Sequence, residues 1–482
     1  MKLKELLNGL QVIKASADLE MEIGSVAYDS RKVTPGSLFV AITGFATDGN
    51  KYIPMALQKG AAAVVTAKEP ETDVPYVLVE SDRLALAVIG SNYFGNPGSA
   101  MKLIGVTGTN GKTSSTLLLK HVLEQVLGAK VGLMGTMENM IGHESIPTER
   151  TTPESFELQA LLGQMRDAGC SHAIMEVSSH AIALERVGGL HYTVAAFTNL
   201  TEDHLDFHKT MENYCDTKAE LFNRCDKAVA NCDDEWFHRL CGNAPCDMLT
   251  VSAKGKAGLY AENVELLSDG VRFTAVYGEE RVDVQLPIPG KFTVYNALTV
   301  LGMALQLGIS LADAAAALKT AKGVKGRVEV VPTPGKDYTI LIDYAHTPDG
   351  LENVLSSVKG FCKGRLIAVF GCGGDRDPIK RPIMGRIGAE IADIAIITSD
   401  NPRTEEPMAI IRDILQGVEG KNNYEVIENR IEAIHHAMDI GKKHDIIVLA
   451  GKGHETYQEI CGVKHHLDER EVVAAYLEET RE

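Results

Sequence analysis

The stretch "KLIGVTGTNGKTSSTLLLKHVLEQVLG", residues 102–128, constrains the fold of this chain more than any other. An apolar run, a glycine-rich turn and a long amphipathic segment follow one another, which predicts a strand, a loop and a helix. Backbone N–H groups of such a loop and of the helix N-terminus can surround phosphate oxygens. We therefore expect a phosphate-binding loop within a parallel α/β sheet.

The predicted nucleotide contacts within this loop are Gly108, Thr109, Asn110, Gly111, Lys112, Thr113 and Ser114. Lys112 would reach the β- and γ-phosphates, and the Thr113 hydroxyl would serve magnesium. The spacing departs from the standard Walker pattern, because Val106 stands five residues before Gly111, where a glycine would be expected. The structural alternative is an ordinary glycine-rich turn between a strand and a helix.

Length and hydrophobic pattern together predict the domain organisation. A chain of 482 residues is too long for one core and suggests three domains. A Gly/Pro-rich stretch at 94–102 and a change of pattern near "GVKGRVEVV" mark the boundaries, so we expect domains at 1–98, 99–327 and 328–482. Strands and helices alternate in the last two, which predicts an α/β fold with a central P-loop-type, mostly parallel sheet and a Rossmann-like C-terminal domain.

The individual elements follow from the same patterns. Strands are expected at 36–42, 61–67, 172–179, 194–200, 339–345, 364–371, 392–399 and 444–451, antiparallel hairpins within 258–290, and helices at 52–60, 295–308 and 310–321.

Charge and cysteine content exclude several classes of protein. The formal net charge is -17 without a long basic run, which argues against binding to nucleic acid or anionic membranes. The nine cysteines are scattered and form no CxxC pair, as expected for buried reduced thiols in the cytosol. No apolar stretch reaches 18 residues, and the N-terminus lacks a signal-peptide core. We expect a cytoplasmic monomer without a membrane span.

Three polar residues end or follow predicted central strands. Glu176 closes "AIMEVSSH", His204 lies in "TNLTEDHLDFH" and Lys218 lies in "YCDTKAELF". Ligands gather at the carboxyl ends of parallel strands, so Glu176 and His204 could face the phosphates and hold magnesium on ATP. Taken singly, each has a plain alternative: a capping or surface carboxylate, a solvated acidic turn, and a surface helix lysine.

Taken together and in this order, the motifs resemble those of the Mur ligases, which build the peptide of bacterial cell-wall precursors. The motifs are "TGTNGKTS", "MEVSSH", "TNLTEDHLDFH", "YCDTKAELF", "YNAL", "KGRVE", "DYAHTPDGL", "GCGGDRDPIKRP" and "DNPR". The resemblance covers essentially the whole chain, and the three-domain layout is also that of the family.

The resemblance implies an ATP-dependent amide-bond ligase of peptidoglycan precursor synthesis that works through an acyl phosphate. In this reading Lys112, Glu176, His204 and Lys218 are catalytic, and Thr113, Glu176, His204 and Lys218 hold Mg²⁺. Lys218 matches the lysine that carbon dioxide converts to a carbamate. Asn296, Arg327 and Asp343 match further positions around the nucleotide.

The resemblance also implies where the UDP-linked substrate binds. Ser30, Thr151, Thr152, Ser178, Arg186 and Lys218 match family positions along UDP, sugar and dipeptide. Hydroxyls and an arginine suit an anionic, amide-rich ligand. Two departures are Leu184, where some members carry glutamine, and "GFAT" at 44–47.

The motif "DNPR" separates family members by the amino acid that they add. Members adding meso-diaminopimelate to UDP-N-acetylmuramoyl-L-alanyl-D-glutamate resemble this sequence, whereas those adding L-lysine usually lack the arginine. Arg403 can bind the extra carboxylate of diaminopimelate through two parallel hydrogen bonds. The other expected contacts of that amino acid are Arg376, Asp400, Asn401, Pro402, Gly451 and Glu455; His454 is expected to be a packing neighbour.

Three other functions compete with this one. An L-lysine-adding ligase is disfavoured by Arg403. A folylpolyglutamate synthase would share the phosphate loop and the modified lysine but not "DNPR" or a UDP-binding domain. A non-catalytic nucleotide-binding protein is disfavoured by the presence of Lys112, Glu176, His204 and Lys218.

Overall fold

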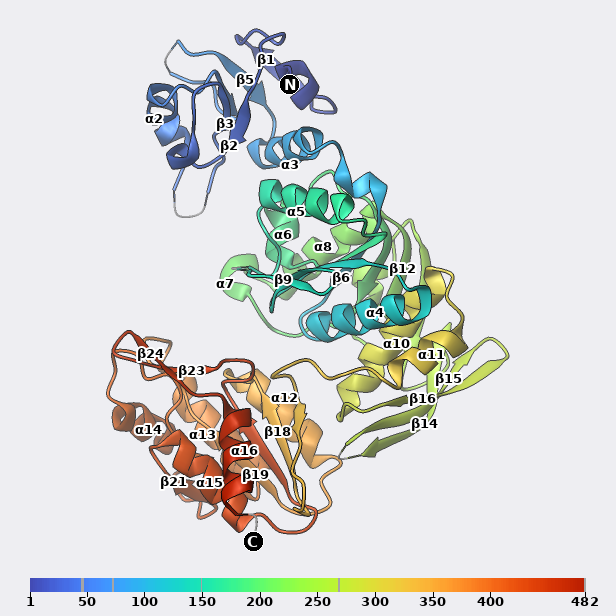
Figure 1. Cartoon of the computed structure of the whole chain (residues 1–482), viewed down its shortest axis with the longest axis vertical. Coiled ribbons are helices and arrows are strands. Elements are labelled where there is room, and N and C mark those ends of the chain that lie inside the picture. The colour runs from blue at the N-terminus through green and yellow to red at the C-terminus, as the bar shows by residue number, and fades with distance from the viewer. Residues whose placement is uncertain (45–46, 72, 149, 268, 481–482) are drawn as a thin grey trace. The chain divides into compact units, whose positions relative to one another are not determined.

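The computed structural model describes residues 1–44, 47–71, 73–148, 150–267 and 269–480, and Figure 1 labels its helices and strands. Phe45 and Ala46 of the "GFAT" segment lie outside the described residues. Contacts divide the chain into two compact units: unit 1 is Met1–Tyr260 with Asn296–Ala317, and unit 2 is Ala261–Tyr295 with Leu318–Glu482. The predicted division into three domains at 98/99 and 327/328 stays a prediction.

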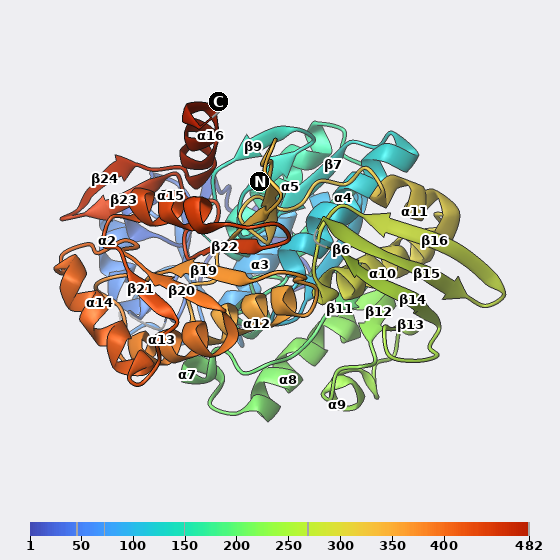
Figure 2. The ribbon, with the colours of Figure 1, turned by 90° about the horizontal axis from the view of Figure 1, so that it is seen from below.

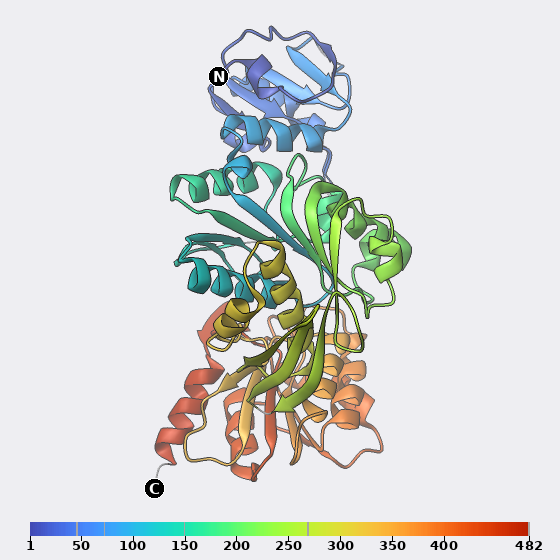
Figure 3. The ribbon, with the colours of Figure 1, turned by 90° about the vertical axis from the view of Figure 1, so that its right-hand side faces the viewer.

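The first sheet of unit 1 has the order β1-β5-β4-β3-β2, with β1 antiparallel to β5 and the other pairs parallel. Leu86 and Ile89 of helix α3 pack on its buried strands (blue in Figure 3). The strands predicted at 36–42 and 61–67 and the helix at 52–60 are confirmed as β3, β4 and α2. The elements are β1 Val12–Ala15, β2 Ser25–Ala27, β3 Ser37–Val40, β4 Ala63–Thr66, β5 Tyr76–Val79, α1 Leu3–Leu6, α2 Ile53–Gln58 and α3 Asp82–Tyr93, with 3-10 turns at Ser30–Lys32, Gly49–Tyr52 and Pro97–Ala100.

The second sheet of unit 1 contains the phosphate loop. Its strands run in the order β13-β12-β11-β6-β10-β7-β8-β9, parallel except for the two pairs that join β7, β8 and β9. β6 is therefore flanked by β10 and β11. The strands are β6 Lys102–Thr107, β7 Val131–Met134, β8 Asn139–Ile141, β9 Glu144–Ile146, β10 His172–Glu176, β11 Tyr192–Phe197, β12 Cys225–Asn231 and β13 Asp247–Ser252.

Helices accompany this sheet, as the alternating pattern predicts. The predicted helices at 295–308 and 310–321 are present as α10 and α11. The helices are α4 Lys112–Leu127, α5 Ser155–Asp167, α6 Ser179–Ala183, α7 Leu205–His208, α8 Met211–Ala219, α9 Phe237–Cys241, α10 Lys291–Gln306 and α11 Leu311–Leu318, with a 3-10 turn at Glu220–Arg224.

The segment 258–290 forms β14 Leu259–Leu267, β15 Gly270–Tyr277 and β16 Glu280–Leu286. β15 and β16 pair antiparallel from Val271↔Leu286 to Tyr277↔Glu280, which confirms the predicted hairpin. The first residues of β14 instead run parallel to β13.

Unit 2 holds a six-stranded sheet in the order β17-β18-β22-β19-β20-β21, parallel except for β17. Figure 2 labels β22, β19, β20 and β21 of this sheet. Helices α12, α13 and α14 pack on one face, and α15 and α16 pack on the other. Covered on both faces, β22 is wholly apolar and buried. The four strands predicted here are β18, β19, β20 and β22; β17, β21 and the β23–β24 hairpin were not predicted.

The bounds in unit 2 are β17 Glu329–Val331, β18 Thr339–Asp343, β19 Leu366–Phe370, β20 Ile394–Ile397, β21 Tyr424–Val426, β22 Ile446–Ala450, β23 Tyr457–Ile460, β24 Val463–His466, α12 Pro348–Lys359, α13 Lys380–Ile391, α14 Pro407–Leu415, α15 Arg430–Ile440 and α16 Glu469–Glu479, with a 3-10 turn at Gln416–Val418.

The predicted fold class, α/β with parallel-rich sheets, is confirmed. All nine cysteines are free, and five of them are buried, as expected for reduced thiols; Cys461 is exposed. Within the described ranges, no helix is long and apolar enough to cross a membrane.

Candidate functional site

The phosphate loop joins β6 to α4, as predicted, and two of its glycines have positive φ. Gly108 has φ 146° and Gly111, the residue before α4, has φ 85°. A Cβ on Gly108 would lie 1.9 Å from Thr198 Oγ1, and one on Gly111 would lie 2.5 Å from Asn296 Oδ1. Both positions therefore require glycine. The structure also places the predicted nucleotide residue Asn296 directly against the loop.

The segment after β11 fixes the shape of this loop. Asn199 accepts from the backbone N–H of Thr109 at its carbonyl (2.8 Å) and from that of Asn110 at its side-chain Oδ1 (2.9 Å). Thr198 Oγ1 donates to the Asn110 carbonyl at 2.6 Å. Sequence reasoning missed Thr198 and Asn199, although both fall inside the quoted motif "TNLTEDHLDFH". Their position directly after β11, the strand next to β6, could have indicated the contact.

Two lysines meet at the start of the loop. Lys112 Nζ donates to the carbonyls of Gly108 (2.9 Å) and Thr109 (2.8 Å), and Lys218 Nζ donates to the same Gly108 carbonyl at 3.0 Å. Lys218 is only 1% exposed and lies over the ring of Tyr214. Burial, and next the charge of Lys112, hold the pKa of Lys218 well below its usual value. The alternative interpretation of Lys218, as a lysine on the exposed surface of a helix, is therefore wrong.

Glu176 ends β10, beside Val106 of β6, and is 1% exposed. Its Oε1 accepts from the backbone N–H of Thr136 at 2.9 Å, and its Oε2 accepts from the Thr136 hydroxyl at 2.9 Å. The Thr136 hydroxyl also lies 3.1 Å from that of Thr151. Glu176 is thus an oriented, buried carboxylate at the carboxyl end of a strand next to the phosphate loop. Thr136 was not predicted.

Two of the residues predicted along the sugar and dipeptide, Ser178 and Arg186, contact a third, Thr152. Thr152 Oγ1 donates to the Glu176 carbonyl at 2.7 Å and accepts from the backbone N–H of Ser178 at 3.2 Å. Arg186 Nη1 donates to the Thr152 carbonyl at 3.2 Å. The structure therefore brings Thr152, Ser178 and Arg186 together beside Glu176, whereas Ser30 lies in the 3-10 turn after β2 and is buried near Met55.

An unpredicted charge cluster adjoins Arg186. Glu154, 8% exposed at its side chain, lies 3.4 Å from Arg186, 3.8 Å from Arg83 and 3.9 Å from Arg150. Burial, opposed by Glu154 and reinforced by the other two arginines, lowers the pKa of Arg186. Three guanidinium groups share one carboxylate, so this region carries a local positive charge despite the acidic composition of the chain.

His204 lies in a left-handed turn with φ 54° and is half exposed. Its backbone N–H donates to Asp203 Oδ1 at 2.8 Å, and its ring packs edge-on to that of His180. Among the described residues, no three His, Cys, Asp or Glu side chains form a group that could hold a metal ion. Mg²⁺ commonly uses one or two carboxylates together with substrate phosphates, and the buried, oriented Glu176 carboxylate fits that pattern.

The remaining predicted nucleotide residues belong to unit 2. Asp343 ends β18 and accepts from the backbone N–H of Val328 at 2.8 Å. Burial raises the pKa of Asp343, and the nearby Arg327 opposes that rise. The Arg327 guanidinium lies over the ring of Tyr344. Neighbouring His454 also packs on Tyr344, as expected of a packing residue.

The "DNPR" turn follows β20, and Arg403 adopts φ 52° within it. Arg403 Nη1 donates to the Gly374 carbonyl at 2.8 Å, and its Nε lies 3.3 Å from Glu459 Oε2. The backbone of Arg403 also pairs with the β23 edge, donating to the Glu459 carbonyl and accepting from the N–H of Cys461. Arg403 is therefore held by two segments that sequence reasoning did not connect to it.

A second arginine borders the same turn. A Cβ on Gly373 would lie 2.9 Å from Arg403 Nη1 and 3.9 Å from Arg376 Cγ. Arg376 is exposed, and its Nη1 donates to the Asp375 carbonyl. The two predicted carboxylate-binding arginines thus flank one glycine. The carbonyl of Pro402 lies against Gly374 so closely that a Cβ there would be 1.9 Å away.

The predicted ammonium-binding residues surround a lysine. Lys452 Nζ donates to Asn401 Oδ1 and Glu455 Oε2 at 3.1 Å each and lies 3.8 Å from Asp400 Oδ1. Gly451 has φ 120°, and a Cβ there would lie 2.5 Å from Asp400 Oδ2. The structure therefore brings Asp400, Asn401, Gly451 and Glu455 together. Sequence reasoning missed Lys452, although it lies inside "AGKGHETY".

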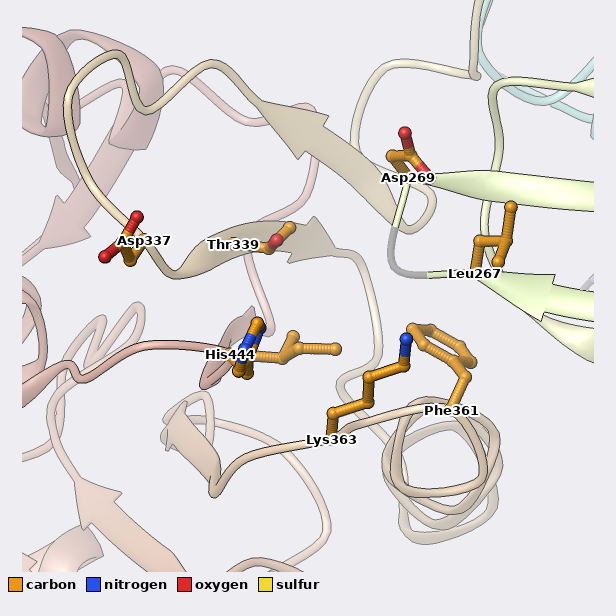
Figure 4. A pocket seen from close by; sticks show the side chains of 8 residues that line it. Leu267, Asp269, Asp337, Thr339, Phe361, Lys363 and His444 are labelled. Carbon is orange, nitrogen blue, oxygen red and sulfur yellow. The ribbon is translucent and has the colours of Figure 1, made fainter.

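Unit 2 also contains a hollow of about 170 Å³ (Figure 4). It is lined by Leu267, Asp269, Asp337, Thr339, Phe361, Lys363, His444 and Ile446. Thr339 and Ile446 begin β18 and β22, so this hollow lies at the amino ends of the strands. The residues predicted around the amino acid follow the carboxyl ends of β19, β20 and β22, where ligands of parallel sheets bind.

Three segments, which together make up most of the chain, match three domains of one protein family. Residues 22–96 match "Mur ligase family, catalytic domain", residues 106–304 match "Mur ligase middle domain", and residues 326–453 match "Mur ligase, glutamate ligase domain".

Two similar proteins carry the same name. A protein of Clostridium tetani is 48% identical over 99% of this chain and 100% of its own length, and one of Clostridium botulinum is 48% identical over 95% and 96%. Both are named UDP-N-acetylmuramoyl-L-alanyl-D-glutamate--2,6-diaminopimelate ligase. A solved structure of the same name is 32% identical, with a TM-score of 0.76 over 100% of this chain and 99% of the other. The chain therefore belongs to the Mur ligase family.

Proposed function

We propose that this chain joins meso-diaminopimelate to the D-glutamate γ-carboxylate of UDP-N-acetylmuramoyl-L-alanyl-D-glutamate, with ATP converted to ADP and phosphate. The chain is a Mur ligase, and the named relatives are diaminopimelate ligases. The observation that carries the choice of amino acid is Arg403. Its guanidinium is held by the Gly374 carbonyl and by Glu459, and its turn also carries Asp400 and Asn401 of the cluster around Lys452.

The chemistry of the amino acid explains this choice. The side chain of diaminopimelate ends in an ammonium and a carboxylate, whereas that of lysine ends in an ammonium alone. Arginine binds carboxylates with two parallel hydrogen bonds, and acidic residues suit the ammonium. A site built for the carboxylate also disfavours lysine, because the arginine would be left without its partner.

The reaction proceeds through two displacements. A γ-carboxylate oxygen attacks the γ-phosphorus of ATP, the bond to ADP breaks, and an acyl phosphate forms. The amine of diaminopimelate then attacks the acyl carbon, the bond to phosphate breaks, and the amine loses a proton. Lys112 offsets the negative charge of the phosphates in the first step, and the loop backbone orients them.

Thr113 and Glu176 would hold Mg²⁺ on the ATP phosphates, and His204 would serve a second ion. When bound, Mg²⁺ neutralises charge on the transferred phosphoryl group. The orientation of Glu176 by both donors of Thr136 supports its role, because each carboxylate oxygen keeps acceptor capacity.

Lys218 would act as a carbamate. Its amine lies in a buried site without an ion pair to any carboxylate of the described residues, and burial favours the neutral amine that reacts with carbon dioxide. The product is an anionic oxygen ligand beside Lys112.

The other expected ligand contacts complete the proposal. The UDP-linked substrate would be bound by Ser30, Thr151, Thr152, Ser178 and Arg186. The nucleotide would be bound by Asn296, Arg327 and Asp343. The reaction would take place in the cytoplasm.

The test measures phosphate release by the full-length chain with ATP, Mg²⁺, UDP-N-acetylmuramoyl-L-alanyl-D-glutamate and either meso-diaminopimelate or L-lysine. Release with diaminopimelate, together with a tripeptide product identified by mass spectrometry, supports the proposal. Release with lysine alone would overturn it, and no release with either amine would favour a non-catalytic nucleotide-binding role.

A further inference from the structure

Lys452 is a fully buried lysine whose surroundings are polar. Its side chain is 0% exposed, and its nitrogen lies within hydrogen-bonding distance of Asn401 and Glu455, with Asp400 close behind. Lysine is almost never fully buried unless it is paired. The "AGKGHETY" loop therefore places a positive charge inside the cluster that is expected to bind an ammonium group of the substrate.

The first consequence of Lys452 is the orientation of Asn401. Asn401 Oδ1 accepts from Lys452 Nζ at 3.1 Å and from the backbone N–H of Glu459 at 2.9 Å. Because two donors meet at this oxygen, the amide nitrogen points the other way, toward Glu455 Oε2 at 2.8 Å. Lys452 thus fixes which end of the Asn401 side chain faces Glu455.

The second consequence is the charge balance of the cluster. Arg430, also fully buried, donates to Glu469 at 2.8 Å and to the Ala450 carbonyl at 2.9 Å. The carboxylates of this region are Asp400, Glu455 and Glu469, and its two cations are Lys452 and Arg430. Three negative and two positive charges leave one negative charge. The adjacent Arg403–Glu459 ion pair does not change this sum, and one ammonium group would neutralise it.

We propose that Lys452 is a specificity-determining positioning residue that makes this cluster accept a zwitterion rather than a lone cation. By neutralising one carboxylate of the Asp400–Glu455 pair, it keeps the turn from repelling the carboxylate that Arg403 and Arg376 would bind. Without Lys452, two uncompensated carboxylates would favour the single ammonium of lysine. The inference rests on the proposed function, because it concerns the amino acid bound at that same site.

The test compares the full-length wild type with Lys452→Met, which keeps an unbranched side chain only one heavy atom shorter and removes its charge. Lys464→Met is the matched control, since Lys464 is exposed and lies over the same Tyr457 ring as Lys452. We measure kcat/KM for meso-diaminopimelate and L-lysine by phosphate release, KM for ATP, and the dissociation constant of each amino acid by calorimetry.

The expected result is a loss of discrimination. Lys452→Met should lower the ratio of kcat/KM for diaminopimelate over lysine by roughly 10- to 100-fold and leave KM for ATP unchanged, while Lys464→Met should change neither. Equal losses for both amino acids would indicate a merely structural role and overturn the inference.

A second variant tests the same charge balance if Lys452→Met does not fold. Glu455→Gln removes one negative charge, so the ratio should move the opposite way, toward diaminopimelate; an unchanged or lower ratio would overturn the inference. Calorimetry separates the two proposals. Wild-type binding of diaminopimelate without turnover contradicts the proposed function alone, and turnover with an unchanged ratio in the variants contradicts the role of Lys452 alone. If the wild type shows no binding of diaminopimelate and no turnover, both proposals are contradicted.

Discussion

Lys112 and Lys218 hydrogen-bond to the same backbone carbonyl, that of Gly108, at 2.9 and 3.0 Å. Two ammonium groups at one acceptor repel each other, and burial of Lys218 adds to the cost of charging it. The shared carbonyl therefore supports the proposed conversion of Lys218 to an anionic carbamate.

Replacing Lys218 by alanine should lower kcat by about 10²- to 10³-fold, because the phosphoryl group loses an anionic ligand held beside its metal. Short carboxylic acids such as formate should partly restore activity by entering the space left by the side chain. Phosphate release measures both effects. The surface change Lys227→Ala serves as control, and normal activity of Lys218→Ala would refute the carbamate role.

Replacing Arg403 by alanine should raise KM for diaminopimelate by about 10- to 100-fold for each of the two charge-assisted hydrogen bonds that its guanidinium would make. KM for ATP should not change. Arg412→Ala is the matched control, since Arg412 is exposed and pairs only loosely with Glu406 at 3.6 Å. An unchanged KM for diaminopimelate would remove Arg403 from the amino-acid site.

Replacing Gly111 by alanine should both destabilise unit 1 and weaken ATP binding. The new Cβ would meet Asn296 Oδ1 at 2.5 Å, in addition to the cost of about 1–2 kcal/mol for a left-handed residue other than glycine. Gly128→Ala isolates the backbone cost, because Gly128 has φ 59° with open space around it. Thermal melts and nucleotide titrations compare the two; equal effects on ATP affinity would contradict the role of the Asn296 contact.

Replacing Arg430 by methionine should destabilise unit 2 by about 3–5 kcal/mol, because Glu469 would keep an unpaired buried charge. The double variant Arg430→Met/Glu469→Leu removes both charges and should recover most of that loss. Urea unfolding, monitored by far-UV circular dichroism, gives the midpoint of unfolding of each variant. A double variant as unstable as the single one would show that the hydrogen bond to Ala450, rather than the ion pair, governs stability.

The histidine His208 should make stability depend on pH. Burial lowers its pKa to about 4, and its Nε2 lies 2.9 Å from Ser179 Oγ. Above pH 6.5 both folded and unfolded states hold it neutral. As pH falls from 6.5 toward 4, the unfolded state takes up a proton first, so stability declines, by at most about 2 kcal/mol at pH 5.

His208→Gln removes this titration and keeps a nitrogen near Ser179. Denaturation midpoints at pH 7.5 and 5.0 should therefore differ less in the variant than in the wild type. An equal pH dependence in both proteins would assign the effect to other groups.

Much of the fold could be predicted, because it follows from local patterns. Apolar runs bounded by turn residues located β6, β10, β11 and the four central strands of unit 2. The edge strands β17 and β21 were not predicted, because a strand of three residues shows little periodicity. The β23–β24 hairpin was not predicted, because its residues are largely exposed and polar. The prediction of a Mur ligase could be made because the motifs keep their order along the whole chain, and the family matches and named relatives confirm it.

By itself, the sequence determined the strand, glycine loop and helix at 102–128 and the presence of an arginine in the turn after β20. These features depend on residues that are neighbours in the chain. Only the tertiary structure decided that Asn296 lies against Gly111, that three arginines share Glu154, and that Lys452 lies beside both Asp400 and Glu455. The physical reason is strand order: β6 lies between β10 and β11, and β22 lies between β18 and β19. Hydrophobic periodicity shows that a strand exists, but not which distant strand will pair with it and bring its loop alongside.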